Sequence, residues 1–252
     1  MNVILDLDGV IWLAEKPIDG SPAAVDRLRA AGHRVLFVTN NSNPTVEDLI
    51  EKLRGMGVGV EPDEIVTSSQ AAAALVDAGS TALVCGGGGV RQALEERGAR
   101  PVDEGDADAV VVGFHREFDY RRLTAAFRAV IHGARLIGTN DDPTYPTPDG
   151  PVPGGGSLLA AVATAAGVEP VVAGKPYQPM ADTVRERLGD DAGDETVLVG
   201  DRPSTDGLMA KRLGVPFYLV LSGVTSEGDD DRDIESRAVA PNLAALVDQE
   251  FA

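Results

Sequence analysis

Short apolar runs alternate with helical patterns along nearly the whole chain, and this alternation limits the choice of fold more than any other feature. An apolar run at Val3–Leu5 precedes a helical pattern over residues 23–31, and a run at Val35–Val38 precedes a helical pattern that ends near Gly55. Alternation of this kind is typical of βα units whose strands form a parallel sheet. We therefore expect an α/β fold.

The same rhythm restarts after Ala78, which indicates a second unit. Apolar runs such as "TALVC" and "DAVVVGF" again alternate with helical patterns, and a turn-rich stretch, "DDPTYPTPDGPVPGGG", precedes the apolar helix "SLLAAVATAAG". We predict a Rossmann-like parallel-sheet core of residues 1–78 and 171–252, with an inserted α/β domain of residues 79–170. The core sheet is expected to resume at "VVAGK" and to continue at "TVLVG" and "PFYLVLSG". Ser21-Pro22 is expected to cap and open the first helix.

The charge of the chain narrows the classes of partner. Its net charge is −18, which disfavours nucleic acid and anionic membranes as partners. No apolar stretch approaches the length of a membrane span, and the N-terminus lacks the pattern of a secretory signal. Cys85 is the only cysteine, which excludes an intrachain disulfide and favours a reducing compartment. We expect a cytoplasmic protein, and an anionic substrate would need local positive charge at its site.

Polar side chains of a particular kind follow several of the predicted core strands. In open α/β sheets, ligands bind beyond the carboxyl ends of the strands. One such residue alone is usually a helix cap, a turn or a solvated side chain, but the set in this order indicates a site. Its members are Asp6, Asp8, Thr39, Asn40, Asn41, Lys175, Asp201 and Asp206.

These residue types suit phosphate chemistry assisted by a metal. Converging carboxylates repel one another unless a cation lies between them, and Mg²⁺ prefers oxygen ligands. Asp6 and Asp201 are the natural ligands, with Asp206 supporting them from behind. A metal-bound Asp6 stays ionised and can act as a nucleophile. Asp8 would then be the general acid for the leaving group and the base for water.

The remaining residues of the set are suited to holding a phosphoryl group. Gly9 allows a tight backbone bend that exposes amides to phosphate. The Thr39 hydroxyl and the amide of Asn40, with Asn41 beside it, are candidates for holding the phosphoryl oxygens by hydrogen bonds. Lys175 would supply a positive charge that stabilises the transition state.

Four motifs resemble those of the haloacid-dehalogenase-like hydrolase superfamily: "DLDGV", "VTNNS", "GKP" and "GDRPSTD". Their order, with a large insertion between the second and third, is similar to the class II, subclass A phosphatases. That group includes p-nitrophenylphosphatase-like, phosphoglycolate, glycerol-3-phosphate, pyridoxal-phosphate and nucleotide phosphatases. The resemblance covers nearly the whole chain and implies hydrolysis of a small phosphorylated metabolite.

The resemblance also implies a role for each matching residue. Asp6 would form an aspartyl-phosphate, and Asp8 would be the acid/base and lend its backbone carbonyl to Mg²⁺. Asp201 would ligate Mg²⁺ with support from Asp206, so the implied metal residues are Asp6, Asp8, Asp201 and Asp206. The residues implied to bind the phosphoryl group are Thr39, Asn40 and Lys175. The inserted domain would be a cap that excludes water and reads the leaving group, and this subclass often forms homodimers through its cap.

Some positions depart from the family pattern or leave two interpretations open. Gly207 follows Asp206 where a large aliphatic residue is commoner, and His115 stands where an acidic residue is common. Gly154–Gly156 could approach substrate or cap the helix at Ser157. "GGGG" at Gly86–Gly89 lacks the spacing of a nucleotide loop, so we predict a turn. "EGDDDRD" is predicted to be a solvated loop.

Two other functions compete with a phosphatase. A phosphotransferase or phosphomutase could use the same aspartyl-phosphate, but such mutases carry a cap between the first two motifs, where this chain has only about thirty residues, too few for an inserted domain as well as a crossover helix. A non-catalytic receiver-like domain also binds Mg²⁺, but it places its acidic residues on different strands. The sequence does not identify the substrate.

Overall fold

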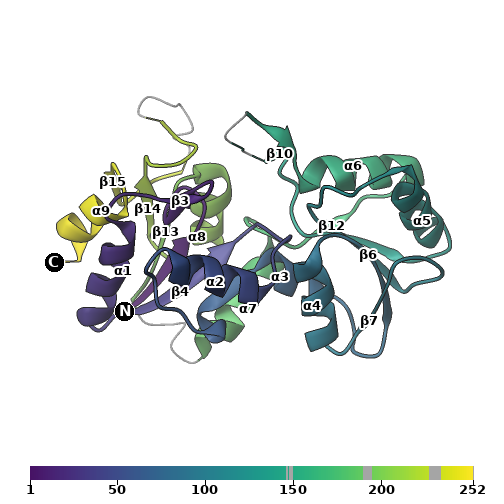
Figure 1. Cartoon of the computed structure of the whole chain (residues 1–252), viewed down its shortest axis with the longest axis horizontal. Helices are drawn as coiled ribbons and strands as arrows, with labels where there is room; N and C mark the ends of the chain where they lie inside the picture. The colour runs from purple at the N-terminus through teal and green to yellow at the C-terminus, as the bar shows by residue number, and fades with distance from the viewer. Residues whose placement is uncertain (146, 148–149, 190–194, 227–233, 252) are drawn as a thin grey trace. The chain divides into compact units, whose positions relative to one another are not determined.

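The computed structural model describes residues 1–145, 147, 150–189, 195–226 and 234–251. The chain divides into two compact units (Figure 1). Unit 1 comprises Met1–Thr39, Glu47–Val66 and Val184–Ala252, and unit 2 comprises Asn40–Val46 and Thr67–Thr183. Across the described residues, no helix combines the length and apolar character needed to cross a bilayer. The predicted "EGDDDRD" loop lies outside the described residues.

Unit 1 is built on a six-stranded sheet in the order β15-β14-β13-β1-β4-β5. The pairs β1–β13, β1–β4, β13–β14 and β14–β15 are parallel. Every residue of β1 is buried because the strand lies inside the sheet, which explains its continuous apolar run. The strands are β1 (Asn2–Asp6), β4 (Arg34–Thr39), β5 (Ile65–Thr67), β13 (Thr196–Gly200), β14 (Phe217–Val220) and β15 (Ala238–Ala240).

Helices and a small hairpin complete the elements around this sheet. Helix α1 (Ser21–Ala30) packs beside α9 (Leu243–Glu250) (Figure 1). The hairpin of β2 (Trp12–Leu13) and β3 (Lys16–Pro17) follows the first strand closely. The other helices are α2 (Val46–Gly55), α7 (Gln178–Leu188) and α8 (Leu208–Leu213), with a 3₁₀ turn, η1 (Pro62–Glu64), and a π-helical turn, η3 (Pro203–Gly207).

Unit 2 has its own five-stranded sheet, in the order β12-β9-β8-β6-β7 with parallel neighbours. Its core packs α5 (Tyr120–Ile131) and α6 (Gly155–Ala166) against the sheet through residues such as Val110, Ala126 and Leu159. The strands are β6 (Thr81–Cys85), β7 (Arg100–Val102), β8 (Ala109–Val112), β9 (Arg135–Gly138) and β12 (Val171–Val172). The remaining elements are α3 (Ser68–Ala73), α4 (Gly88–Glu96) and the hairpin of β10 (Thr144–Tyr145) and β11 (Val152–Pro153).

The predicted α/β fold, with a parallel core sheet and an inserted parallel-sheet domain, is confirmed. The prediction that "VVAGK" rejoins the core sheet is wrong, because Val171 pairs with Ile137 and Val172 with Gly138 in the sheet of unit 2. The reason is the crossover through α6, which returns the chain to the edge strand beside β9. The division at residues 78/79 and 170/171 stays a prediction.

The start of α1 also differs from the prediction. Gly20, in the left-handed conformation, precedes the helix and is its cap residue, and Ser21 is its first residue. The Ser21 hydroxyl donates to the carbonyl oxygen of Val10 at 2.8 Å instead of capping a helical N–H. The buried Ser21 side chain therefore ties the start of α1 to the loop after β1 and does not cap the helix.

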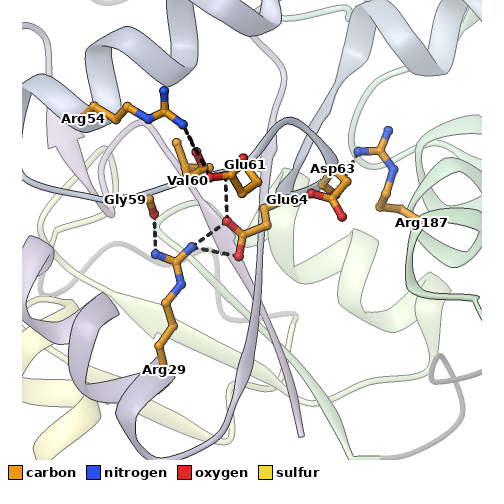
Figure 2. A network of polar contacts seen from close by, with 8 residues as sticks. All are labelled: Arg29, Arg54, Gly59, Val60, Glu61, Asp63, Glu64 and Arg187. Atoms are coloured by element: carbon orange, nitrogen blue, oxygen red, sulfur yellow. Dashed lines mark hydrogen bonds and ion pairs between the residues drawn. The ribbon is translucent and has the colours of Figure 1, made fainter.

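Three arginines hold the loop that leads from α2 to the edge strand β5 (Figure 2). Arg29 donates to both carboxylate oxygens of Glu64 at 2.9 and 2.8 Å, and also to the Gly59 carbonyl. Arg54 donates to the Val60 carbonyl at 2.9 Å. Arg187 donates to the carbonyls of Asp63 and Ile65, both at 2.9 Å. Because these bonds satisfy backbone acceptors of an irregular segment, they fix the entry into β5.

Candidate active site

Three buried carboxylates meet at the carboxyl edge of the sheet of unit 1. Asp6 is the last residue of β1, Asp201 directly follows β13, and Asp206 lies in the turn η3. Each offers an oxygen within 4.8 Å of the others, and all three side chains are buried. Because β1 and β13 are neighbours in the sheet, the structure brings these three carboxylates together, and their role as a site stays a prediction.

Two glycines make room for the Asp201 carboxylate. A Cβ atom on Gly9 would lie 2.4 Å from Asp201 Oδ2, and one on Gly223 would lie 1.9 Å from the same oxygen. Gly9 also has a φ of +82°, which disfavours other residues. The backbone N–H of Val224 donates to Asp201 Oδ2 at 2.5 Å. Gly223 was missed by the sequence analysis. It stands three residues after the end of β14, just as Gly9 stands three residues after the end of β1.

Asp206 is fixed by the turn that carries it. The backbone N–H of Arg202 donates to Asp206 Oδ2 at 3.1 Å, and Gly200 lies so close that a Cβ there would be 2.4 Å from the Asp206 Cβ. The π-helical turn at Pro203–Gly207 passes directly into α8. Gly207 is buried, and a Cβ there would approach Ile234 Cγ2 within 2.7 Å. This close packing explains why glycine stands where the family more often has a large aliphatic residue.

Asp8 belongs to the tight turn between β1 and the hairpin. Its Oδ1 accepts a hydrogen bond from the indole Nε1–H of Trp12 at 2.9 Å. Its neighbour Leu7 donates its backbone N–H to Asp6 Oδ1 at 2.8 Å. Both carboxylates of the first motif therefore accept hydrogen bonds from donors in the same short segment, Leu7 and Trp12.

Thr39 ends β4 in unit 1 and is buried, whereas Asn40 and Lys175 meet within unit 2. The Asn40 Oδ1 accepts from the backbone N–H of Lys175 at 2.7 Å, and the Asn40 Nδ2 donates to the Lys175 carbonyl at 3.1 Å. The same Nδ2 donates to Asp142 Oδ2 at 3.2 Å. Asn41 closes the turn that follows, where its Oδ1 accepts from the N–H of Asn43 at 3.2 Å.

The glycine clusters of unit 2 serve close packing. A Cβ on Gly87 would lie 2.1 Å from Asn43 Oδ1, and one on Gly89 would lie 2.1 Å from the Pro44 carbonyl oxygen. In the second cluster, α6 begins at Gly155, and a Cβ on Gly156 would lie 2.2 Å from the Asp141 carbonyl oxygen. Both clusters let a helix start lie directly against a neighbouring loop.

His115 is buried just beyond β8, with its side chain only 2% exposed. Burial lowers the pKa of its imidazole, and Arg122 lowers it further, while Glu117 opposes the shift. Its ring packs edge-on against Phe118, with ring centroids 5.8 Å apart. A neutral histidine of this kind contributes packing and polarity, so it does not supply the local positive charge that an anionic substrate needs.

The carboxylate cluster fits a divalent metal ion. Its donors are oxygens from three buried aspartates, and these are the ligands that Mg²⁺ prefers. Close packing of Gly9 and Gly223 fixes the position of one of them, as a rigid metal site requires. Asp6, Asp201 and Asp206 are the residues whose carboxylates could ligate the ion.

Comparison with known proteins agrees with this geometry. The family described as haloacid dehalogenase-like hydrolase matches residues 3–100, and a second HAD-hydrolase-like family matches residues 172–246. The acid sugar phosphatase of Staphylococcus aureus is 34% identical over 244 residues, which are 96% of this chain and 92% of the relative.

Solved structures of two phosphatases also resemble this chain. A p-nitrophenyl phosphatase from Archaeoglobus fulgidus is 33% identical, with a TM-score of 0.91 and 98% of each chain covered. A glycerol phosphate phosphatase from Mycobacterium tuberculosis in complex with magnesium is 31% identical, with a TM-score of 0.86; the match covers 97% of this chain and 75% of that one.

A parallel α/β sheet with a buried triad of carboxylates at its carboxyl edge, interrupted by a second α/β unit, defines a hydrolase with an inserted domain. The chain belongs to the haloacid dehalogenase-like hydrolases. Its relatives are phosphatases of small phosphate monoesters, so the predicted enzyme class, a phosphoric monoester hydrolase, is confirmed. A magnesium-bound relative and the triad itself bear out the predicted cofactor.

Proposed function

We propose that this chain is a Mg²⁺-dependent phosphatase that hydrolyses a small phosphate monoester through an aspartyl-phosphate. The observation that carries the proposal is the buried cluster of Asp6, Asp201 and Asp206, whose oxygens lie within 4.8 Å of one another. Asp8 stands two residues beyond Asp6 in the same turn. One segment therefore supplies both a nucleophile and an acid/base, as covalent phosphoryl transfer requires.

In the first step, a carboxylate oxygen of Asp6 attacks phosphorus, and the bond between phosphorus and the oxygen of the leaving group breaks. Asp8 donates its proton to that oxygen, so the product leaves as an alcohol. In the second step, Asp8 takes a proton from water, whose oxygen attacks phosphorus. The bond to Asp6 breaks, inorganic phosphate is released, and both carboxyl groups regain their starting states.

Other residues hold the reacting groups. Mg²⁺ held by Asp6, Asp201 and the backbone carbonyl of Asp8 would neutralise negative charge on the phosphoryl group, and Asp206 supports this set. The Thr39 hydroxyl and the backbone N–H of Asn40, followed by Asn41, bind phosphoryl oxygens. Lys175 supplies the positive charge that the net charge of −18 makes necessary.

The inserted domain of residues 79–170 acts as a cap that shields the reaction from water and selects the leaving group. The relatives act on a sugar phosphate, a glycerol phosphate and p-nitrophenyl phosphate. We propose a substrate of this size. A cytoplasmic location, a homodimer formed through the cap and the absence of nucleic-acid or membrane partners stay predictions.

The test is a screen of the purified protein with Mg²⁺ against phosphate monoesters: sugar phosphates, glycerol 3-phosphate, phosphoglycolate, nucleoside monophosphates and pyridoxal phosphate. Inorganic phosphate should appear in step with the alcohol, and EDTA should stop turnover until Mg²⁺ is restored. Transfer of phosphate to a second alcohol without release would favour the phosphotransferase. Metal-independent hydrolysis, or no hydrolysis of any ester, would count against the proposal.

The variant Asp6→Asn tests the nucleophile. It removes the attacking oxyanion while keeping the side-chain shape, so turnover should fall by at least a thousandfold with little change in thermal unfolding. Asp26→Asn, an exposed aspartate on α1, is the matched control and should keep full activity. Full activity of Asp6→Asn would exclude covalent catalysis by Asp6.

A further inference from the structure

Trp12 lies against the acidic group that the proposed function makes the proton donor. Its indole is only 2% exposed, and its Nε1–H donates to Asp8 Oδ1 at 2.9 Å. Trp12 is the only tryptophan in the chain. A buried indole N–H usually finds an acceptor, but here the acceptor is a carboxylate of the first motif.

The backbone holds the two residues in this relationship. The N–H of Gly9 donates to the Trp12 carbonyl at 2.7 Å, and the N–H of Trp12 donates to the Leu7 carbonyl at 3.2 Å. Trp12 then opens β2, whose pairing with β3 sets the direction of the chain. These backbone bonds hold the main chain of Asp8 and Trp12 in one closed turn, and the burial of the Trp12 side chain restricts rotation of the indole.

A cation lies over the ring of Trp12. The Lys52 ammonium is 4.5 Å from the centre of the Trp12 ring. It is held there by a hydrogen bond of 3.0 Å to the Ala14 carbonyl in the same hairpin. A cation over an indole is attracted to the ring face and draws electron density from it, which makes the N–H a stronger donor.

We propose that Trp12 is a positioning residue that orients the carboxyl group of Asp8 for proton transfer, and that Lys52 supports it. The bond from the indole to Oδ1 holds the carboxyl group in one orientation, from which its proton passes to the leaving group. After delivery, the N–H stabilises the carboxylate that remains, which is the base for water in the second step. The inference rests on the proposed function, because it assigns a partner to the acid/base of that reaction.

This role makes a specific kinetic prediction. A leaving group that is a weak base departs without protonation, whereas a more basic one needs the acid. Loss of the indole N–H should therefore harm esters with basic leaving groups more than p-nitrophenyl phosphate. A purely structural role of Trp12 would lower kcat/KM for all of them by the same factor.

The experiment measures kcat/KM for a series of substituted phenyl phosphates, from p-nitrophenyl to phenyl, in the wild type and in Trp12→Phe. Phenylalanine keeps an aromatic ring but has no donor. We expect p-nitrophenyl phosphate to lose less than about threefold and phenyl phosphate to lose about ten- to one-hundredfold, a part of the usual contribution of a general acid. Lys52→Met should shift the series in the same direction by a smaller factor.

A second substitution guards against a folding defect of Trp12→Phe. Replacing Trp12 by benzothienylalanine, in which sulfur takes the place of the N–H, keeps the shape of the indole and removes only the donor. The same change in the ratio of the two substrates is expected. A ratio within threefold of the wild type in this folded protein overturns the inference while wild-type turnover leaves the proposed function intact. If the wild type itself hydrolyses none of these esters or those of the broader screen, the proposed function fails first.

Discussion

Replacing Gly223 with alanine should dislodge Asp201 from the metal site. The added Cβ would lie 1.9 Å from Asp201 Oδ2, whereas ordinary contacts of this kind begin near 3.4 Å. The φ of Gly223 lies outside the left-handed region, so the effect is steric and not conformational. The carboxylate oxygen or the backbone must therefore yield by roughly 1.5 Å, although ligand distances in metal sites hold to about 0.2 Å.

The expected consequence is a loss of metal affinity with the fold retained. We expect Mg²⁺ binding, measured by calorimetry, to weaken at least tenfold, and kcat/KM to fall about a hundredfold, as is usual when a reacting group is misplaced by an ångström. Gly55→Ala is the matched control, because a Cβ there meets nothing within 4 Å. If folded Gly223→Ala bound Mg²⁺ with wild-type affinity, Asp201 would not be a metal ligand confined by this glycine.

Two further predictions concern unit 2. Asn40→Ala removes both hydrogen bonds to the backbone of Lys175; KM in steady-state assays should rise about ten- to one-hundredfold because the lysine is no longer held, whereas an unchanged KM would mean that Asn40 does not position it. Burial raises the pKa of the Cys85 thiol from 9.0 to about 11. Because the unfolded chain loses its thiol proton first, stability should fall between pH 9 and 11 by about 2–3 kcal/mol more in the wild type than in Cys85→Ser. Urea unfolding at pH 8 and pH 11 measures this difference, and equal losses in both proteins would show that the thiol is not the cause.

The carboxylate triad was predictable because it depends on topology. The carboxyl ends of parallel strands lie at one edge of a sheet, so acidic residues at the ends of β1 and β13 had to approach one another once those strands were recognised. The "DLDGV" and "GDRPSTD" stretches could be placed at strand ends from apolar runs alone.

The residues that sequence reasoning missed depend on direction and on chain path. Whether Trp12 faces Asp8 is decided by the pairing of β2 with β3, and an apolar pattern carries no information on that hairpin. The sheet to which Val171 belongs is decided by the crossover through α6, because an apolar dipeptide can pair with either sheet. In both cases the local sequence is compatible with several partners, and only the tertiary path selects one.

Asn40 shows how this distinction changes an assignment. An amide at a strand end could bind phosphate with its side chain or with its backbone, and the sequence left that choice open. In the structure the side-chain amide spans the N–H and the carbonyl of Lys175 and also reaches Asp142. An amide engaged on both of its atoms cannot turn to a phosphoryl oxygen without releasing the lysine. If Asn40 binds phosphate, its backbone N–H is therefore the better donor, and the side chain acts on the substrate only through Lys175.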